Sequence, residues 1–150
     1  MKSNISIITV VKNDENNIIK TIKSTLNQKK CQFEYIVCDG DSKDLTSKKI
    51  INYKKKNSKK FIYIRSKDKN LYDGINKAIK KAKGEYIFLL HSGDIFKSNL
   101  TIYGIYKQLN NKLDLLSGNL AYFKISKGKR LISRVWRHPI KKIDNVSNPN

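Results

Sequence analysis

The sequence has little of several residue types, and each scarcity excludes a class of protein. Two cysteines among 150 residues are too few for a disulfide-stapled fold. Cys38 lies inside an apolar run, as a small core residue does, and Cys31 has no histidine nearby. The apolar runs are far shorter than the roughly 18 residues of a membrane-spanning helix. We therefore expect a globular protein. The absence of a cleavage site after residues 5–11 favours the cytoplasm.

Glycine-rich phosphate-binding motifs are also missing. The seven glycines form neither a Gly-x-Gly-x-x-Gly fingerprint nor a P-loop, which removes the main support for dinucleotide-binding and NTPase domains. No Ser/His/Asp or Cys/His set stands at an informative spacing. The remaining candidates for chemistry are three segments that contain acidic residues.

Acidic residues are scarce, since 12 Asp and Glu stand against 32 Lys and Arg, for a formal net charge of +20. Such a charge attracts nucleic acid, anionic lipid or phosphorylated ligands. The lysine cluster at residues 48–60 is interpreted as a solvated helix face. In residues 124–142, basic residues alternate with Ile132, Val135 and Trp136, which favours contact with an anionic membrane surface. A nucleic-acid-binding module ranks last, because it leaves the placement of the acids unexplained.

Apolar runs and helix signals alternate along the chain. Short β-rich runs predict buried strands at residues 5–11, 33–38, 61–65 and 85–91. Caps and helical spacing predict helices near residues 15–28, 45–56, 72–83 and 99–111. Strand-like stretches follow near residues 113–123 and 130–135. The alternation predicts an α/β fold, a three-layer α/β/α sandwich around a mostly parallel sheet. We expect one domain over residues 1–150, with poor order from about residue 124.

Several acids directly follow predicted strands, where a parallel sheet binds its ligands. The turn at residues 39–44, with Asp39 and Asp41, is either a ligand-binding turn or an ordinary helix cap. The turn at residues 91–94 places Asp94 where it can bind Mg²⁺ or Mn²⁺, or it is a plain turn before the next helix. The segment 67–77 places polar side chains on the first turns of a helix, where they can bind an anion. The alternative is that they belong to an ordinary amphipathic helix.

Taken in order, these segments resemble family-2 glycosyltransferases of GT-A fold. The matching pieces are Thr9-Val10-Val11-Lys12-Asn13-Asp14-Glu15 with Ser24 to Gln28, Glu34 to Asp44, Asp68 to Lys77, and Gly84 to Asp94. The last two are similar to a subgroup often found in surface-polysaccharide gene clusters. The resemblance covers about residues 5–123.

The resemblance implies a role for each matching position. The base pocket would be lined by Thr9, Asn13, Asp14 and Glu15, and Asp39 would hydrogen-bond the base, usually uracil. The residues beside the ribose and diphosphate would be Lys69, Asp73 and Asn76. Asp94 would hold Mn²⁺ or Mg²⁺. The implied reaction is inverting transfer of a sugar from a UDP-sugar to a glycan or lipid-linked acceptor. The enzyme would be cytoplasmic, with peripheral contact at the inner face of the plasma membrane.

Two departures from the family pattern qualify these implications. His91 and Gly93 stand where the family's metal motif has its earlier acids, so metal binding rests largely on Asp94 and the diphosphate. The family's catalytic base usually lies in a later acceptor-side segment, near where this chain ends at Asn150. The catalytic base therefore stays unassigned, and the alternative is a truncated, non-catalytic nucleotide-binding remnant.

Overall fold

The computed structural model describes residues 5–57, 61–109, 115–127 and 129–137. The chain divides into two compact units, Met1–Leu109 and Asn110–Asn150. Each unit is described by itself, and the single domain expected over residues 1–150 stays a prediction.

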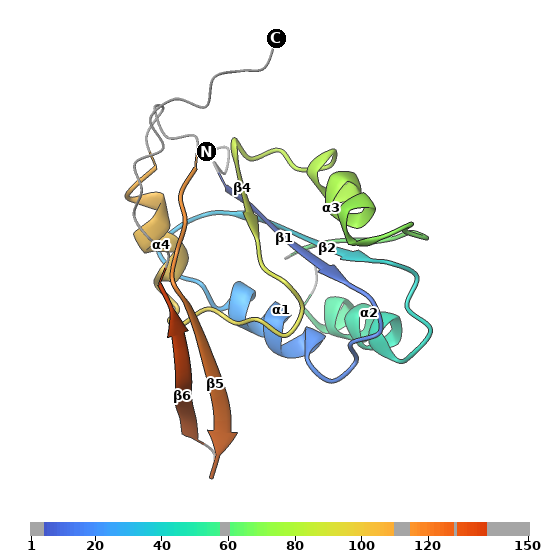
Figure 1. Cartoon of the computed structure of the whole chain (residues 1–150). Helices are drawn as coiled ribbons and strands as arrows, with labels where there is room; N and C mark the ends of the chain where they lie inside the picture. The colour runs from blue at the N-terminus through green and yellow to red at the C-terminus, as the bar shows by residue number, and fades with distance from the viewer. Residues whose placement is uncertain (1–4, 58–60, 110–114, 128, 138–150) are drawn as a thin grey trace. The chain divides into compact units, whose positions relative to one another are not determined.

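The first unit contains a four-stranded parallel sheet in the order β3-β2-β1-β4 (Figure 1). Its strands are β1 (Ile5–Val11), β2 (Glu34–Asp39), β3 (Ile62–Arg65) and β4 (Tyr86–Leu89). Its helices are α1 (Ile18–Leu26), α2 (Thr46–Lys56), α3 (Leu71–Ile79) and α4 (Thr101–Tyr106). Strands and helices alternate along the chain, so the predicted α/β class with a parallel sheet is confirmed. The observed helices are shorter than predicted, because apolar spacing does not locate the end of a helix.

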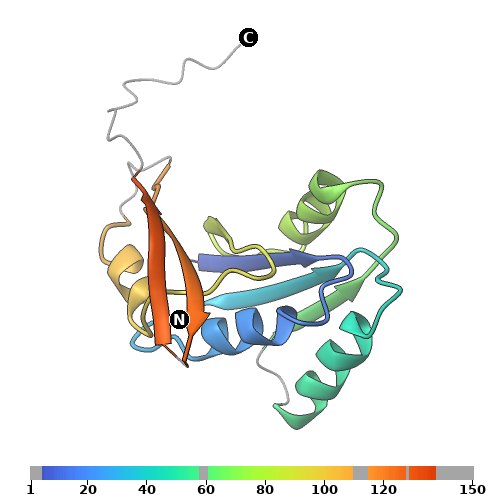
Figure 2. The ribbon, with the colours of Figure 1, turned by 60° about the horizontal axis from the view of Figure 1, so that its bottom comes forward.

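Side chains along β1 alternate between two covered faces of the sheet. Ile5, Ile7 and Val11 pack with apolar residues of α1, α2 and α4. On the opposite face, Ile8 packs with Ala78 of α3. Figure 2 shows α1 and α2 on one side of the sheet and α3 on the other. A strand covered on both faces is apolar at nearly every position, which explains the almost uninterrupted apolar run in this part of the sequence.

The order of the strands creates a natural ligand site at one edge of the sheet. The chain runs from β1 through β2 to β3 on one side and then returns to the other side of β1 for β4. In parallel sheets, such a reversal opens a crevice at the carboxyl ends of the strands. These ends are nearly level, since Val11 pairs with Asp39 and Asp39 with Arg65. The loops that follow these strands hold five of the predicted site residues, Asn13, Asp14, Glu15, Lys69 and Asp94. The other four, Thr9, Asp39, Asp73 and Asn76, lie within strands or helices.

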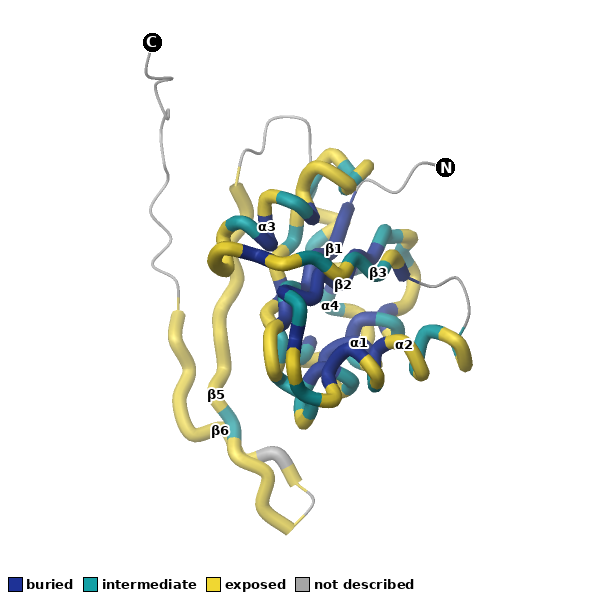
Figure 3. Tube along the Cα trace, turned by 90° about the vertical axis from the view of Figure 1, so that its right-hand side faces the viewer, coloured by how far each residue is buried: buried dark blue, intermediate teal, exposed yellow. Residues whose placement is uncertain are grey.

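The second unit is described as an antiparallel hairpin. Strand β5 (Leu120–Ser126) pairs with β6 (Lys129–Trp136), with a register shift between Tyr122 and Phe123. Most of its described residues are exposed, including the apolar ones (yellow in Figure 3). The structure describes strand as far as Trp136, and the poor order expected from about residue 124 stays a prediction. Residues 138–150 lie outside the described part. Among the described residues, no helix is long and apolar enough to cross a membrane.

Candidate nucleotide site at the carboxyl edge of the sheet

The loop after β1 and the loop after β2 are joined by reciprocal hydrogen bonds. The Asn13 amide donates to Ser42 Oγ at 2.9 Å, and Asn13 Oδ1 accepts from the Lys43 amide at 2.8 Å. Asn13 and Asp41 have φ angles of 52° and 58°, in the left-handed region that Asn and Asp tolerate better than other side chains. The sequence therefore places turn-forming residues at the two points where the loops must bend sharply.

Asp14 and Glu15 extend this connection. The Asp14 amide donates to Thr46 Oγ1 at 2.9 Å, and Glu15 Oε2 accepts from the Leu45 amide at 2.8 Å. The Glu15 carboxylate thus lies at the start of α2, which suits the positive end of the helix dipole. Asn13 and Glu15 therefore use their side chains to fix loop geometry, and their contact with a base stays a prediction.

Asp39, at the end of β2, is fully buried and accepts three hydrogen bonds from the protein. Its Oδ1 accepts from the Ser42 amide at 2.9 Å, while Oδ2 accepts from Ser47 Oγ and from Tyr63 Oη at 2.9 Å. Burial, together with the nearby Asp39 carboxylate, raises the pKa of Tyr63 to about 12. The structure gives Asp39 a part in holding the β2–α2 turn, and its predicted bond to a base stays untested.

The turn after β4 is hydrogen-bonded to the loop after β1 and to α1. Ser92 Oγ donates to Asp14 Oδ2 at 2.7 Å, and the Gly93 amide donates to Thr21 Oγ1 at 3.0 Å. Gly93 has a φ of 95°, a conformation that glycine adopts without strain. The Asp94 amide closes the turn by donating to the His91 carbonyl at 3.0 Å. The structure therefore brings Asp14 together with the turn at residues 91–94, and both follow strands at the same edge of the sheet.

The side chains at this turn fit one mode of divalent-cation binding. Asp94 is exposed, and its carboxylate is a hard oxygen donor of the kind that Mg²⁺ and Mn²⁺ accept. Among the described residues, no group of three or more His, Cys, Asp or Glu could enclose a metal ion. The arrangement therefore fits an ion shared between one carboxylate and a ligand's phosphates, as Mg²⁺ is commonly bound, and not an all-protein cage.

The N-terminus of α3 is organised by a network of polar side chains. Asn70 caps the helix by accepting from the Asp73 amide at 3.0 Å, and Asp73 Oδ2 accepts from the Lys69 amide at 3.0 Å. Lys77 Nζ lies 2.8 Å from Asp68 Oδ1 and 2.9 Å from Asp73 Oδ2. The Lys69 amide and the Lys77 ammonium hold the pKa of Asp73 below its ordinary value of 3.8. Asp73 is thus a charged helix cap.

Two further predicted residues lie elsewhere. Thr9 is fully buried on the α1 face of the sheet, where its hydroxyl and that of Tyr35 share a 3.0 Å hydrogen bond. Asn76 is exposed on α3. The roles expected for Thr9 towards a base and for Asn76 towards a diphosphate stay predictions.

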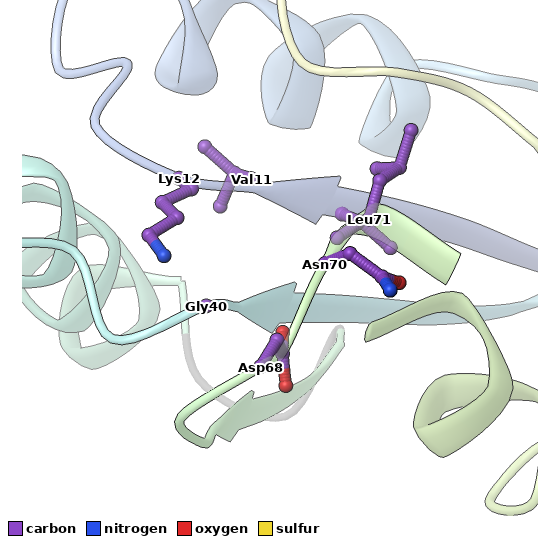
Figure 4. A pocket seen from close by; sticks show the side chains of 7 residues that line it. Val11, Lys12, Gly40, Asp68, Asn70 and Leu71 are labelled. Atoms are coloured by element: carbon purple, nitrogen blue, oxygen red, sulfur yellow. The ribbon is translucent and has the colours of Figure 1, made fainter. Parts of the chain in front are cut away.

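A pocket of about 200 Å³ opens beside these loops (Figure 4). The strands and loops around it contribute mostly apolar or small groups, from Val10, Val11, Lys12, Gly40, Asp68, Asn70 and Leu71. None of the nine residues predicted from the sequence is among these seven; the predicted residues lie in the surrounding loops and elements. The pocket walls therefore come from the ends of β1 and β2 and from the segment that leads into α3.

Asp68 is the pocket residue with an unmet chemical requirement. It is only 9% exposed, and its Oδ1 accepts from Ser66 Oγ and Lys77 Nζ, both at 2.8 Å. Its Oδ2 is buried and has no hydrogen-bond partner among the residues that the structure describes. An unpartnered buried acceptor costs about 1–3 kcal/mol, and more when it is charged. This carboxylate oxygen can therefore accept a hydrogen bond that no described residue donates.

Two glycines make room for that oxygen. A Cβ atom added at Gly40 would lie 3.2 Å from Asp68 Oδ2, and one added at Gly74 would lie 2.7 Å from it. Any larger residue at position 74 would force the Asp68 side chain or its neighbours to move. Both glycines are thus required by the position of the Asp68 carboxylate.

The strand-end rule that selected Asp39 and Asp94 also applies to Asp68, three residues beyond the end of β3. The rule locates residues at an edge of the sheet, but it does not tell which carboxylate oxygens are already bonded. Val11 and Lys12 follow from the same rule, because they end β1 and begin its loop. Gly40 carries no chemical group, so only its contacts could identify it as a pocket residue.

The parallel sheet, the helices on both of its faces and the pocket at the strand ends define a Rossmann-like α/β domain with a ligand site at the carboxyl edge. Comparison with known proteins narrows this class. The chain belongs to glycosyl transferase family 2, whose model matches residues 6–150. The residues that carried the sequence resemblance lie within this match.

Curated relatives share part of their length with the chain. The UDP-Glc:alpha-D-GlcNAc-diphosphoundecaprenol beta-1,3-glucosyltransferase WfgD of Escherichia coli is 32% identical over 115 residues, which are 77% of this chain and 45% of WfgD. An uncharacterized glycosyltransferase of Rickettsia bellii is 38% identical over 96 residues, which are 63% of this chain and 14% of that protein. The chain thus spans less than half the length of these two relatives.

Solved structures show the same architecture. S. aureus TarS 1-349 in complex with UDP superposes with a TM-score of 0.57 at 25% identity, over 71% of this chain and 32% of that fragment. The mannosyltransferase PcManGT of Pyrobaculum calidifontis, solved with GDP-Man and Mn²⁺, gives a TM-score of 0.66 at 15% identity, over 71% of this chain and 32% of PcManGT. The second likeness shows the fold alone.

Proposed function

We propose that this chain is the nucleotide-sugar-binding part of an inverting glycosyltransferase that uses a UDP-sugar donor in bacterial-type surface-polysaccharide synthesis. The pocket at the carboxyl edge of the sheet carries this proposal, because it combines apolar walls with one carboxylate oxygen that has no hydrogen-bond partner among the described residues. The identity to WfgD, whose name specifies UDP-glucose and an undecaprenol-linked acceptor, supports a uridine donor and a lipid-linked or glycan acceptor.

Each part of the edge has a proposed task. The pocket and the loop after β1 receive the base, the N-terminal part of α3 lies beside the ribose and diphosphate, and Asp94 faces the diphosphate. Mn²⁺ or Mg²⁺ held by Asp94 and the phosphates would neutralise the charge that develops on the departing UDP. Lys69 is exposed on the α3 loop and supplies positive charge near the same phosphates.

Transfer also requires a base that deprotonates the acceptor hydroxyl. Among the predicted and observed site residues, each buried carboxylate is engaged by protein donors or lies in the pocket assigned to the donor nucleotide. The base is therefore left unassigned. The second candidate is a truncated, non-catalytic nucleotide-binding remnant of such an enzyme.

We also propose a peripheral contact with anionic membrane through the β5–β6 hairpin. Its described residues include exposed Leu131, Ile132 and Val135 together with exposed Lys129 and Arg134. Apolar side chains that can enter the interface, combined with positive charge, are what bind peripheral proteins to anionic lipid. Such a contact would bring the enzyme to lipid-linked acceptors on the cytoplasmic face.

Titration calorimetry with UDP, with and without Mn²⁺, tests donor binding. We expect saturable UDP binding that Mn²⁺ strengthens, and we expect Asp94→Asn to abolish the gain from Mn²⁺ while leaving metal-free binding unchanged. Glu85→Gln, an exposed carboxylate change just before the amino end of β4, is the matched control. Absence of UDP binding under both conditions would contradict the proposal.

A UDP-sugar hydrolysis assay on the same protein separates the two candidate functions. Release of UDP from UDP-glucose supports a catalytic chain, whereas UDP binding without turnover supports the remnant. The two assays use one preparation, so folding and metal content are the same in both.

A further inference from the structure

We propose that Asp68 recognises the nucleotide base, and that its Oδ2 accepts a hydrogen bond from the imide N–H of uracil. This inference rests on the proposed function, because it assigns the base-reading residue of the same site. It differs from the expectation for Asp39, whose two carboxylate oxygens are bonded to Ser42, Ser47 and Tyr63.

Asp68 has one carboxylate oxygen that is left for a ligand. An ionised carboxylate only accepts, so a ligand atom that satisfies Asp68 Oδ2 must carry a hydrogen. Oδ1 is already bonded to Ser66 and Lys77, which leaves one acceptor for the ligand. A single acceptor matches a single N–H donor better than it matches the paired N–H groups of guanine.

The shape of the space around this oxygen also suits a base. Val10, Val11 and Leu71 give the pocket apolar walls, and Gly40 has no side chain to fill it. Apolar walls with one or two placed polar groups are typical of sites for flat heterocycles. Figure 4 shows Lys12, Gly40 and Asp68 side by side where the first three strands end. The pocket therefore suits a ring that enters edge first.

Uracil has the complementary edge. Its N3–H lies between two carbonyl oxygens, so the donor can face Asp68 while Lys12, which also lines the pocket, donates to a flanking carbonyl. Cytosine carries a lone pair at N3, which would oppose the carboxylate. Oδ2 is covered by its neighbours, and a rotation about the Asp68 Cβ–Cγ bond that is small enough to keep Oδ1 beside Ser66 and Lys77 turns Oδ2 towards the ring. This torsion is broad and soft in Asp side chains.

Gly40 completes the argument. Its φ does not lie in the left-handed region, so backbone conformation does not require a glycine there. The space does, because a Cβ at this position would lie 3.2 Å from Asp68 Oδ2 and 3.5 Å from the Lys12 side chain. A glycine at the end of β2 thus leaves the approach between Lys12 and Asp68 open.

Metal-free calorimetry with the wild-type chain tests the inference without any variant. We expect UDP to bind, and we expect N3-methyl-UDP and CDP to bind about ten- to a hundredfold more weakly, as loss of a hydrogen bond to a charged group predicts. UDP, N3-methyl-UDP and CDP carry the same diphosphate, so the net charge of the protein cannot produce this order of affinities.

Asp68→Asn provides a second readout, because an amide can donate to cytosine N3. We expect this variant to lose affinity for UDP and to bind CDP better than the wild type does, which reduces or reverses the UDP preference. Asp41→Asn is the control: it removes a carboxylate that pairs with Lys43 and Arg65 and does not line the pocket. Circular dichroism verifies that both variants are folded.

The outcomes separate the inference from the proposed function. If UDP and N3-methyl-UDP bind the wild type equally, Asp68 does not read N3–H, and the inference fails while UDP binding stands. If no nucleoside diphosphate binds, both the inference and the proposed function fail. If Asp68→Asn is unfolded, the N3-methyl comparison on the wild type alone decides.

Discussion

Ser92 and Asp14, 78 residues apart in the chain, are joined by a 2.7 Å hydrogen bond from the serine hydroxyl to Asp14 Oδ2. This bond connects the turn after β4 to the loop after β1, on the two sides of the point where the strand order reverses. The Gly93 amide adds a bond to Thr21 Oγ1 at 3.0 Å. The position of Asp94 is therefore set by contacts to β1's loop and to α1, and not by its own turn alone.

Ser92→Ala should loosen the position of Asp94 while keeping its carboxylate. Loss of one partly buried, charge-assisted hydrogen bond should lower the free energy of unfolding by about 1–2 kcal/mol. It should also weaken UDP binding in the presence of Mn²⁺ more than without it. Urea unfolding and calorimetry measure the two effects. Ser133→Ala, on the exposed hairpin, is the matched control, and equal behaviour of the two variants would refute the anchoring role.

Asp39→Ala should be strongly destabilising, because it leaves the Ser42 amide, Ser47 Oγ and Tyr63 Oη without their common acceptor. Loss of such a buried network should cost about 3 kcal/mol or more, and Tyr63→Phe about 1–2 kcal/mol. A double-mutant cycle in urea should give a coupling between Asp39 and Tyr63. If Asp39→Ala instead kept wild-type stability and lost UDP binding, Asp39 would contact the base as the family resemblance implies.

The sequence was sufficient to predict the edge of the sheet at which the acidic turns gather. Residues 5–11 are apolar because both faces of β1 are covered, and turn-forming acids follow the strands because parallel strands end together. Asp14 and the 91–94 turn were therefore expected near each other, and Ser92 does contact Asp14.

The sequence could not show which carboxylate is free. Asp39 and Asp68 both lie at strand ends, and their difference depends on partners that folding brings to them. Asp39 accepts from Ser47 and Tyr63, whereas Asp68 Oδ2 lies near Gly40 and Gly74 and has no hydrogen-bond partner in the described part of the chain. A spacing rule describes the backbone, but the satisfaction of a particular oxygen depends on side chains from other elements.

Acid should remove the contribution of Asp73 to stability. Its pKa is held below 3.8 by the Lys69 amide and Lys77, so its stabilising effect is present above the unfolded pKa and is lost as the pH falls through the folded pKa. Lys77 has a raised pKa and stays charged throughout this range. The urea midpoint of Asp73→Asn should therefore lie below that of the wild type at pH 7, and the two should converge once the pH has fallen below the folded pKa of Asp73. A difference that persists unchanged at low pH would contradict this role.

Charge reversal on the hairpin should abolish binding to anionic vesicles. Arg134→Glu with Arg137→Glu replaces two exposed positive charges beside apolar side chains, and each is worth about 1 kcal/mol at an anionic surface. Sedimentation with vesicles containing phosphatidylglycerol measures the loss. Lys55→Glu with Lys56→Glu makes the same change in net charge on α2, where Ile51 is the exposed large apolar residue, against Leu131, Ile132, Val135 and Trp136 on β6. Equal loss in both double variants would indicate general electrostatic attraction and not a hairpin contact.

Alanine at two helical glycines should have opposite effects on stability. Alanine is better than glycine in a helix by about 1 kcal/mol, so Gly104→Ala, whose Cβ meets nothing within 4 Å, should be stabilising. At Gly74 the new Cβ would lie 2.7 Å from Asp68 Oδ2 and 2.9 Å from Val10 Cγ1, and overpacking of this kind costs about 1–3 kcal/mol. Gly74→Ala should therefore be neutral to destabilising in urea, and it should weaken UDP binding, because the Asp68 carboxylate must move. If it were as stable as Gly104→Ala and bound UDP normally, Asp68 would be mobile enough to yield, and its position in the pocket would not be fixed by the two glycines.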